Sequence, residues 1–300
     1  MNKEDITDWF KNLQEDIASN LEKLDGKGFF KEDLWDRKGG GGGCTRVMEE
    51  GRIIEKGGVN FSAVYGKTPE KMAWSQGIPE SDFYATGISI VLHPYHPMIP
   101  IIHMNTRYFE MESGEKWFGG GIDLTPHYVS LSDAAFFHGY LKKLCDRFHS
   151  NYYPTFKKEA DDYFYIRHRN ETRGIGGIFF DRLSDPDENK MEKIFRFTRA
   201  VGSSFFPIYK ELVNRNMNKV FNQRDKLWQE IRRGRYVEFN LVWDKGTKFG
   251  LETEGRTESI LMSLPSSARW IYDHQPLLKS KEEETHNWLR KGIDWIKMTY

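Results

Sequence analysis

The stretch from residue 83 to residue 126 constrains this chain most, because it places reactive polar side chains on two segments that otherwise resemble buried strands. Side chains alternate between the two faces of a strand, so polar and aliphatic residues separate onto opposite faces along 87–93 and again along 101–107. A hairpin across the proline-rich turn at 93–98 would bring the polar residues onto one face. They are Ser89, His93, His103, Asn105 and Arg107. That face is too polar for an ordinary core and predicts an active site.

The charge balance narrows the class of partner. The 300 residues include 44 Lys and Arg and 44 Asp and Glu, so no net field would hold a nucleic acid or an anionic membrane. A small or medium-sized substrate fits better. No linker rich in Pro, Gly and Ser separates two apolar halves, and we therefore expect a single domain over residues 1–300.

The cysteines and the N-terminus predict a cytoplasmic location. Cys44 and Cys145 are too few for a disulfide framework, and Cys145 lies among apolar helical positions where a buried thiol is usual. The first five residues are acidic and lack an apolar leader, and no apolar run approaches the length of a membrane span.

Periodicity and capping signals predict an α+β fold with a mostly antiparallel sheet. Strands are expected at 59–65, 87–92, 101–111, 235–243 and 248–253, the last two joined as a hairpin at 244–246. Helices are expected at 6–24 (stopping at Gly26), 132–148, 154–168, from 185 onward with a kink or break at Pro207, 222–233 (ended by Gly234), and after Ser280, which forms a capping box with Glu283.

Four histidines lie within or beside the expected elements: His93, His103, His138 and His168. Imidazole is a common ligand of transition metals, so the set is a candidate site for a divalent metal ion. The sequence contains no short ligand pair of the His-Glu-x-x-His type. General acid/base catalysis, contact with a substrate carboxylate, or simple hydrogen bonding in a polar pocket would explain the same residues.

A single acid and two arginines complete the candidate chemistry. Asp123 follows three glycines, where backbone allows a ligand to come close, and predicts a base or a hydrogen-bond acceptor for an N–H group. Its alternative role is to cap the turn at Thr125. Arg107 and Arg256 lie in or after expected strands and suit substrate carboxylates, whereas most other arginines, including the pair 232–233, are expected to be solvated or paired with acids.

Four collinear blocks of this sequence, at 87–97, 117–126, 161–182 and 234–265, resemble oxygen-dependent coproporphyrinogen III oxidases. The resemblance extends from about residue 30 to the end of the chain. It implies an enzyme of haem biosynthesis that oxidatively decarboxylates two propionates of coproporphyrinogen III to vinyl groups, giving protoporphyrinogen IX with O2 as oxidant. It also implies a large antiparallel sheet between layers of helices, and a homodimer formed through Tyr236 to Tyr272.

The resemblance assigns roles to individual residues. It places substrate contacts at Ser89, Asn105, Arg107, Gly255 and Arg256, an acid/base role at His103, a candidate metal set at His93, His103, His138 and His168, and the acid of the glycine block at Asp123. Glu254 stands where some members have a small residue, so its role is open. Because a porphyrinogen is electron-rich, no cofactor is required for the redox chemistry.

In the mechanism that the resemblance implies, Asp123 accepts from or deprotonates pyrrole N–H groups, His103 transfers protons, and Arg107 and Arg256 hold propionates. Two alternatives belong to other classes. One is a metal-dependent non-haem oxygenase that uses the four histidines. The other is a tetrapyrrole-binding protein without catalytic activity.

Overall fold

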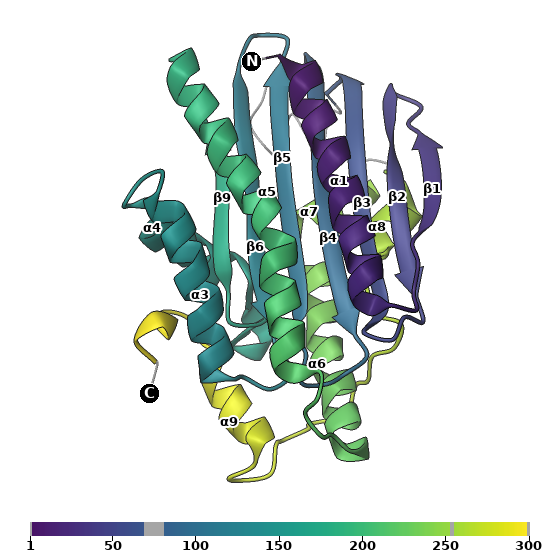
Figure 1. The fold of residues 1–300 in the computed structure, drawn as a ribbon, viewed down its shortest axis with the longest axis vertical. Coiled ribbons are helices and arrows are strands. Elements are labelled where there is room, and N and C mark those ends of the chain that lie inside the picture. Colours follow the sequence, from purple (N-terminus) through teal and green to yellow (C-terminus); the bar gives the residue numbers. More distant parts are fainter. Residues whose placement is uncertain (1, 69–80, 253–254, 299–300) are drawn as a thin grey trace.

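A seven-stranded antiparallel sheet lies at the centre of the chain (Figure 1). The structure, a computed structural model, describes residues 2–68, 81–252 and 255–298. The strand order is β1-β2-β3-β4-β5-β6-β9. The bounds are Lys31–Asp36 (β1), Gly41–Glu49 (β2), Ile54–Lys67 (β3), Asp82–Pro94 (β4), Ile101–Met111 (β5), Lys116–Thr125 (β6) and Gly177–Leu183 (β9). The strands expected at 59–65, 87–92 and 101–111 are confirmed as parts of β3, β4 and β5.

Helices cover both faces of this sheet, which confirms the predicted α+β sandwich (Figure 1). One layer contains α1 (Lys3–Asp25), α3 (Leu131–Asp146) and α5 (Glu188–Asn216), and the opposite layer contains α6 (Gln223–Val242), α7 (Lys245–Glu252) and α8 (Thr257–Leu261). Helix α4 (Tyr152–Tyr163) packs on β9. The remaining elements are β7 (Tyr165–Ile166), η1 (Arg167–Arg169), β8 (Glu171–Thr172), α9 (Lys281–Trp288) and η2 (Trp295–Met298).

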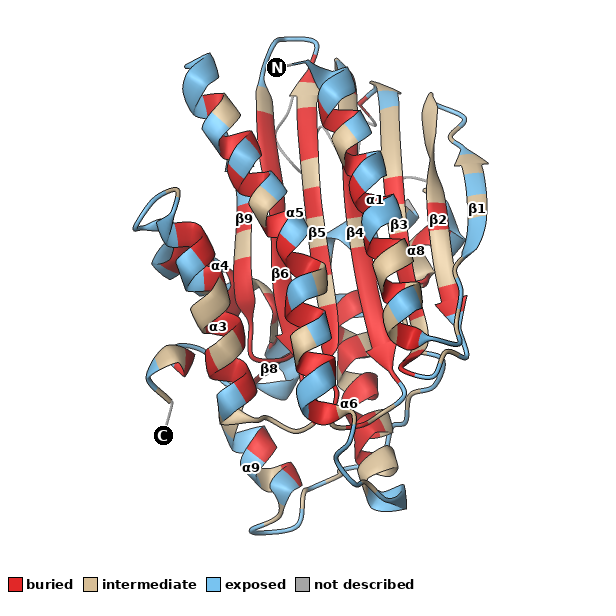
Figure 2. Cartoon of the chain, viewed as in Figure 1, coloured by how far each residue is buried: buried red, intermediate tan, exposed pale blue. Residues whose placement is uncertain are grey.

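The apolar core lies between the sheet and the layer of α1 and α5 (Figure 2). One row of directly opposed aliphatic side chains crosses five strands and is almost completely buried: Val59, Ile90, Met104, Ile122 and Ile178. Removal of this apolar surface from water is the main stabilising contribution to such a layer. The core therefore occupies one face of the sheet and leaves the other face available for polar groups.

Helix ends follow the capping signals in the sequence. Asn2 caps α1 through its side chain, and α1 ends at Gly26 in the left-handed conformation, with φ of 71°. Ser280 caps α9 by accepting a hydrogen bond from the backbone N–H of Glu283. The predicted end of α1 at Gly26 and start of α9 after Ser280 are confirmed, whereas α1 begins at Lys3 and not at residue 6. The Glu283 carboxylate accepts from the N–H of Lys279, so the predicted capping box is only half formed.

The predicted strands at 235–243 and 248–253 are wrong, because both segments are helical. Buried side chains recur at helical spacing along α6, from Trp228 through Arg232 and Tyr236 to Phe239. The alternation of large apolar and polar side chains at 235–243 is part of this helical repeat and does not indicate a strand. Asp244 starts α7 instead of a hairpin, since its carboxylate accepts from the N–H of Thr247 at 2.7 Å.

Three predicted helix boundaries are also wrong. Gly234 lies inside α6, where a Cβ would meet the carbonyl oxygen of Arg269 at 2.8 Å, so this glycine permits close packing of a neighbouring segment. Pro207 lies within α5, which continues from Glu188 to Asn216, so the helix is not interrupted there, while the predicted kink stays a prediction. Helix α4 ends at Tyr163, before the short strand β7, and not near residue 168.

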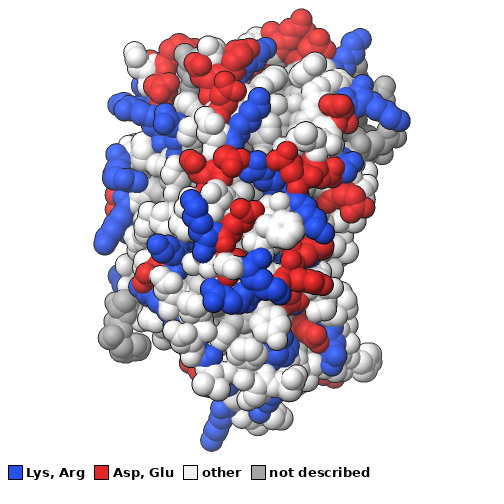
Figure 3. All heavy atoms as spheres, turned by 45° about the vertical axis from the view of Figure 1, so that its right-hand side comes forward, with Lys and Arg blue, Asp and Glu red and all other residues white. Residues whose placement is uncertain are grey.

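Lys, Arg, Asp and Glu side chains are interspersed over the surface seen in Figure 3, in keeping with their equal numbers. The expectation of no broad field for a polyanion is consistent with this view. No helix within the described residues is long and apolar enough to cross a membrane.

Candidate active site

The predicted polar face exists. In the antiparallel register of β4 and β5, Ser89 lies opposite Asn105 and Gly87 opposite Arg107, while Val91 lies opposite His103. These residues therefore share a face, and His93 follows two positions after Val91 on that same face. Ser89, His103, Asn105 and Arg107 are each partly accessible, whereas His93 is fully buried.

Glycines leave part of this face without side chains. On β6, Gly119 lies opposite Arg107 and Gly121 lies opposite Asn105. Gly87 adds a third such position on β4. These glycines lie on two strands, β4 and β6, on either side of β5, and the side chains of Arg107 and Asp181 occupy the space over Gly119. Asn60 of β3, which lies opposite Ser89, extends the polar row by one strand and was missed from the sequence.

His103 and Asp123 form a hydrogen-bonded pair across β5 and β6, where they are directly opposed. The distance from Nδ1 of His103 to Oδ1 of Asp123 is 2.7 Å. The His103 side chain is 21% exposed, but that of Asp123 is only 1% exposed. The pair therefore presents an imidazole to the polar face and keeps its carboxylate beneath the surface.

Arg173 binds the Asp123 carboxylate on the buried side of the His103–Asp123 pair. Its NH2 group lies 2.8 and 2.7 Å from the two carboxylate oxygens of Asp123, and its NH1 group donates to Oδ1 of Asn240 at 3.0 Å. Three aromatic rings surround the guanidinium, with centroids 4.4 to 4.7 Å away: Phe164, Tyr236 and Phe239. Helix α6 supplies Asn240 and two of these rings, so it fixes Arg173 against the sheet.

These contacts determine the protonation of Asp123. Burial would raise the pKa of this carboxyl, but the charge of Arg173 and the hydrogen bond with His103 lower the pKa overall. An ionised carboxylate can only accept, so Nδ1 of neutral His103 carries the proton and Nε2 is left as an acceptor. Within the described parts of the chain, Nε2 has no hydrogen-bond partner. The arrangement is an oriented general base.

This geometry does not support the expected direct contact between Asp123 and a pyrrole N–H group. The carboxylate is almost completely buried, and His103 and Arg173 already bind both oxygens. The sequence did not single out Arg173, because only the tertiary structure brings it to Asp123 from 50 residues away. Its position in the run Thr172-Arg173-Gly174, inside one of the four resembling blocks, was the available signal.

The four candidate metal ligands do not converge. In α3, His138 has Tyr153 Oη 3.0 Å from Nδ1 and the carbonyl of Ile175 2.9 Å from Nε2. His168 accepts from the indole N–H of Trp243 at 2.9 Å, so its Nε2 donates to Glu238 at 2.8 Å. Both histidines therefore use both ring nitrogens within the protein.

His93 has a structural environment as well. Its Nε2 donates to the carbonyl of Ser263 at 2.8 Å, and its ring packs edge-on against Tyr236 with centroids 5.0 Å apart. Burial lowers the pKa of His93 to about 3, so the ring is neutral. Among the described residues, no three His, Cys, Asp or Glu side chains are placed to hold a metal ion. The four histidines therefore do not fit a shared metal site.

We predict that His138→Ala destabilises the fold while the folded protein keeps its activity. Truncation leaves the hydroxyl of Tyr153 and the carbonyl of Ile175 unsatisfied and opens a cavity, and we expect a loss of about 3 kcal/mol in the free energy of unfolding. Urea titration, with kcat measured on the folded fraction, checks this. A normal unfolding midpoint or a large loss of kcat would contradict it.

The same residue should make stability sensitive to acid. Burial lowers the pKa of folded His138 to about 3 from its ordinary 6.5, so the unfolded chain binds a proton that the folded chain does not. The stability that this neutral histidine contributes is present above pH 6.5 and is lost as the pH falls toward 3. The slope of unfolding free energy against pH in that window should be shallower for His138→Ala than for the wild type.

Both arginines expected to hold substrate already bind an acid. Arg107 lies 2.8 Å from Oδ1 of Asp181 through NH2 and donates to Oδ1 of Asn105 at 3.0 Å through NH1. Arg256 pairs with Asp33 of β1. Gly255 bonds through its N–H to the carbonyl of Gly250 at 2.8 Å. Glu254 lies outside the described residues.

The adjacent arginines Arg232 and Arg233 are paired, as expected, but they are not solvated. Arg232 binds Glu171 at 2.9 Å and Arg233 binds Glu55 at 2.8 Å. Both arginines belong to α6, and both side chains are buried. They attach this helix to the rest of the fold and so support the position of Arg173.

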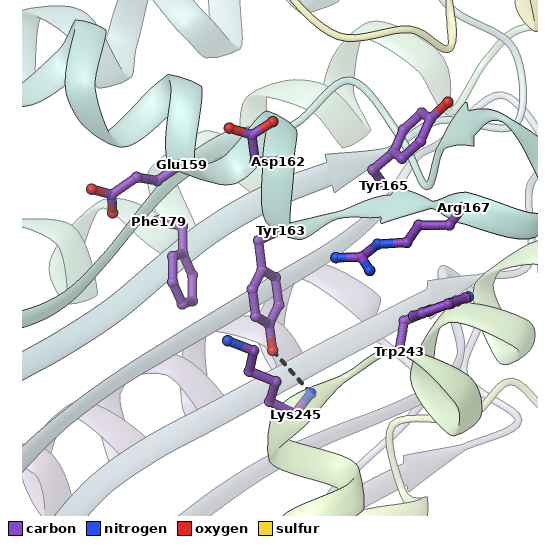
Figure 4. A pocket seen from close by; sticks show the side chains of 8 residues that line it. All are labelled: Glu159, Asp162, Tyr163, Tyr165, Arg167, Phe179, Trp243 and Lys245. Carbon is purple, nitrogen blue, oxygen red and sulfur yellow. Dashed lines mark hydrogen bonds between the residues drawn. The ribbon is translucent and has the colours of Figure 1, made fainter. Parts of the chain in front are cut away.

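A cavity of about 330 Å³ opens beside the polar face (Figure 4). Phe179, which lies opposite Gly121 on the sheet, forms one wall and stacks on Tyr163 with centroids 4.4 Å apart. The hydroxyl of Tyr163 donates to Asp244 at 2.8 Å. Arg167 and Lys245 bring positive charge to the same cavity. Two acids, Glu159 and Asp162, also line it, so the charged groups balance, and its aromatic walls suit an apolar or aromatic part of a large ligand.

Comparison with known proteins shows the family of this chain. The family model described as coproporphyrinogen III oxidase matches residues 5–295. The oxygen-dependent coproporphyrinogen-III oxidase of Glycine max, a chloroplastic protein, is 47% identical over 95% of this chain and 77% of its own length. The mitochondrial enzyme of that name from Rattus norvegicus is 48% identical over 94% of this chain and 66% of its own length. This chain therefore belongs to the coproporphyrinogen III oxidase family.

Proposed function

We propose that this chain is an oxygen-dependent coproporphyrinogen III oxidase. It converts two propionates of coproporphyrinogen III to vinyl groups with loss of CO2, and O2 accepts the electrons released. The carrying observation is the partly open face that combines a glycine surface, Arg107 and the oriented imidazole of His103. Family membership supports the substrate and the oxidant.

Each group has a defined task on that face. Gly87 and Gly121 place no side chain between the macrocycle and the sheet, whereas the space over Gly119 is taken by the Arg107–Asp181 ion pair. Arg107 binds a propionate through the N–H donors of its planar guanidinium. Ser89 and Asn105, which lie opposite each other on β4 and β5, donate or accept further hydrogen bonds with the substrate. Nε2 of His103 takes or returns the proton that moves during oxidation. Asp123 and Arg173 hold that imidazole in one tautomer and do not contact substrate.

The test is a reaction started from anaerobically prepared coproporphyrinogen III by adding enzyme and air, with chromatography of the tetrapyrroles and an oxygen electrode. We expect protoporphyrinogen IX and consumption of O2. Binding of a porphyrin without O2 consumption would instead indicate a non-catalytic carrier. Activity lost with a chelator and restored by Fe(II) would indicate a non-haem iron oxygenase. A divalent metal bound elsewhere would be found by elemental analysis.

Arg107→Ala and Arg256→Ala should both raise KM for the propionate-bearing substrate. Each removes a charge-assisted contact worth roughly 1.5–3 kcal/mol, which corresponds to about a 10- to 150-fold loss in kcat/KM. Lysine should restore only part of the loss because it lacks the planar fork. Steady-state kinetics with the free acid and with propionate esters check this. Wild-type kcat/KM in either alanine variant, or equal turnover of the esters, would contradict it.

The homodimer through the segment from Tyr236 to Tyr272, which the resemblance implies, remains a prediction, and the exposed side chains of this segment support it. The segment carries exposed apolar side chains at the end of α6 and in the following chain: Leu241, Val242, Leu251, Trp270, Ile271 and Tyr272. Exposed apolar groups gathered in one segment are typical of an interface.

Light scattering at micromolar concentration should give twice the 35.3 kDa mass of the chain. Leu241→Asp combined with Ile271→Asp should produce monomers. The control is Leu34→Asp, which changes a more exposed leucine on the edge strand β1 and should leave the dimer intact. A monomeric wild type would contradict the proposal.

The cytoplasmic location and the single domain over residues 1–300 also remain proposals. The relatives named above are chloroplastic or mitochondrial, so fractionation of the source cells is needed to test the location. Limited proteolysis that yields no stable fragment would support one domain.

A further inference from the structure

The ion pair between Arg107 and Asp181 passes directly over a glycine. Arg107 belongs to β5 and Asp181 to β9, and strand β6 lies between them. Gly119 is the β6 residue opposite Arg107. A Cβ on Gly119 would lie 2.7 Å from Oδ1 of Asp181 and 3.0 Å from NH2 of Arg107. The glycine thus provides the space in which this pair meets.

The Asp181 carboxylate binds one of the guanidinium N–H groups with which Arg107 would bind a substrate carboxylate. Its contact at 2.8 Å is a charge-assisted hydrogen bond to NH2, and NH1 is held by Asn105. Both side chains are accessible, at 36% for Arg107 and 46% for Asp181. Ion pairs this exposed contribute little net stability, so an incoming carboxylate can exchange with Asp181.

The buried arginine of the same site differs in this respect. Arg173 and Asp123 are 2% and 1% exposed, so separating them would leave charges without solvent. That pair is permanent. Arg256 resembles Arg107 instead, because its pair with Asp33 is also accessible, at 37% and 43%. The pairs of both arginines expected to bind propionates are therefore exposed enough to exchange, unlike the pair of Arg173.

We infer that Asp181 is an internal stand-in for a substrate propionate. It keeps Arg107 oriented across Gly119 while the site is empty, and a propionate displaces it from the guanidinium on binding. This inference rests on the proposed function, since it takes Arg107 as a propionate-binding residue. Asp181 is accordingly a residue that limits affinity for carboxylates, and its own charge repels a carboxylate that has not yet reached Arg107.

Asp181→Asn tests the inference, with coproporphyrin III, the oxidised tetrapyrrole that cannot undergo the reaction, as the probe. Its Kd is measured by fluorescence titration for the wild type, Asp181→Asn, Arg107→Ala and the double variant. We expect Asp181→Asn to bind about threefold to fivefold more tightly, because a competing charge of ordinary surface strength is removed. Binding should also weaken more steeply with salt, since the site gains net positive charge.

The effect should depend on Arg107. In the Arg107→Ala background, Asp181→Asn should change Kd far less than it does in the wild type. The matched control is Asp185→Asn, which removes an acid from the chain after β9 that pairs with Lys190 at 3.4 Å and not with an arginine. It should leave Kd unchanged. Circular dichroism confirms that each variant is folded.

The outcomes separate the inference from the proposed function. Weaker or unchanged binding by Asp181→Asn would overturn the inference, because it would make Asp181 a plain support for Arg107 or a bystander. Tighter binding that persists without Arg107 would also overturn it. If Arg107→Ala alone binds the porphyrin normally, the propionate-binding role assigned to Arg107 fails, whereas the oxidase activity is judged separately by turnover.

Discussion

Asp123→Asn should lower kcat by about 10²- to 10⁴-fold while the chain still folds. The carboxylate has a single accessible neighbour, His103, and holds Nδ1 of that ring at 2.7 Å. A neutral amide can present its N–H to His103 and favour the wrong tautomer, which would remove the free lone pair from Nε2. The measurement is kcat under saturating O2, with melting temperature and oligomeric state recorded on the same sample.

Asparagine is a better test than alanine. Alanine would leave the buried guanidinium of Arg173 without a charge partner, a loss that typically costs 3–5 kcal/mol of stability, so lost activity could reflect lost folding. A folded Asp123→Asn protein with near-normal turnover would show that the carboxylate does not orient a catalytic base. A protein that fails to fold would be compared with the conservative Asp123→Glu variant.

His103→Ala should cause a similar loss of about 10²-fold or more in kcat, with little effect on stability. Its side chain is partly exposed on the polar face, and it shares that face with Asn105 and Arg107. Removing it deletes the proton-transfer group but opens no buried cavity. Added imidazole should restore part of the turnover of His103→Ala if the ring acts in proton transfer.

His138→Ala provides the matched control for His103→Ala. Both changes remove an imidazole, but His138 is fully buried and hydrogen-bonded at both nitrogens, so its loss should act on stability. If one essential metal bound all four histidines, both variants would lose bound metal and activity together. Elemental analysis of the two variants beside the wild type distinguishes this case from separate roles.

The sequence by itself determined three central strands of the sheet, β3, β4 and β5, and most of the content of the polar face, but it predicted no strand at β1, β2, β6 or β9. Along 88–90 and 102–105, β4 and β5 alternate between apolar and polar residues, and a register that buries one set must place the other on the opposite face. Ser89, His103, Asn105 and Arg107 could therefore be assigned to one face from the sequence alone. The helix ends at Gly26 and Ser280 were equally predictable, because capping depends on a few neighbouring residues.

Only the tertiary structure decided which helix covers the polar face and which charged residues bind Asp123 and Arg107. Residues 235–243 alternate locally like a strand, yet they form the end of α6, because burial against the sheet follows the helical period from Trp228 onward. The same packing brings Arg173 to Asp123 and Asp181 to Arg107, contacts that span 50 and 74 residues. Local periodicity contains no information about such pairs. They arise from strand order and from which helix covers which rows of the sheet, and they turn Asp123 from an expected substrate contact into a buried support for His103.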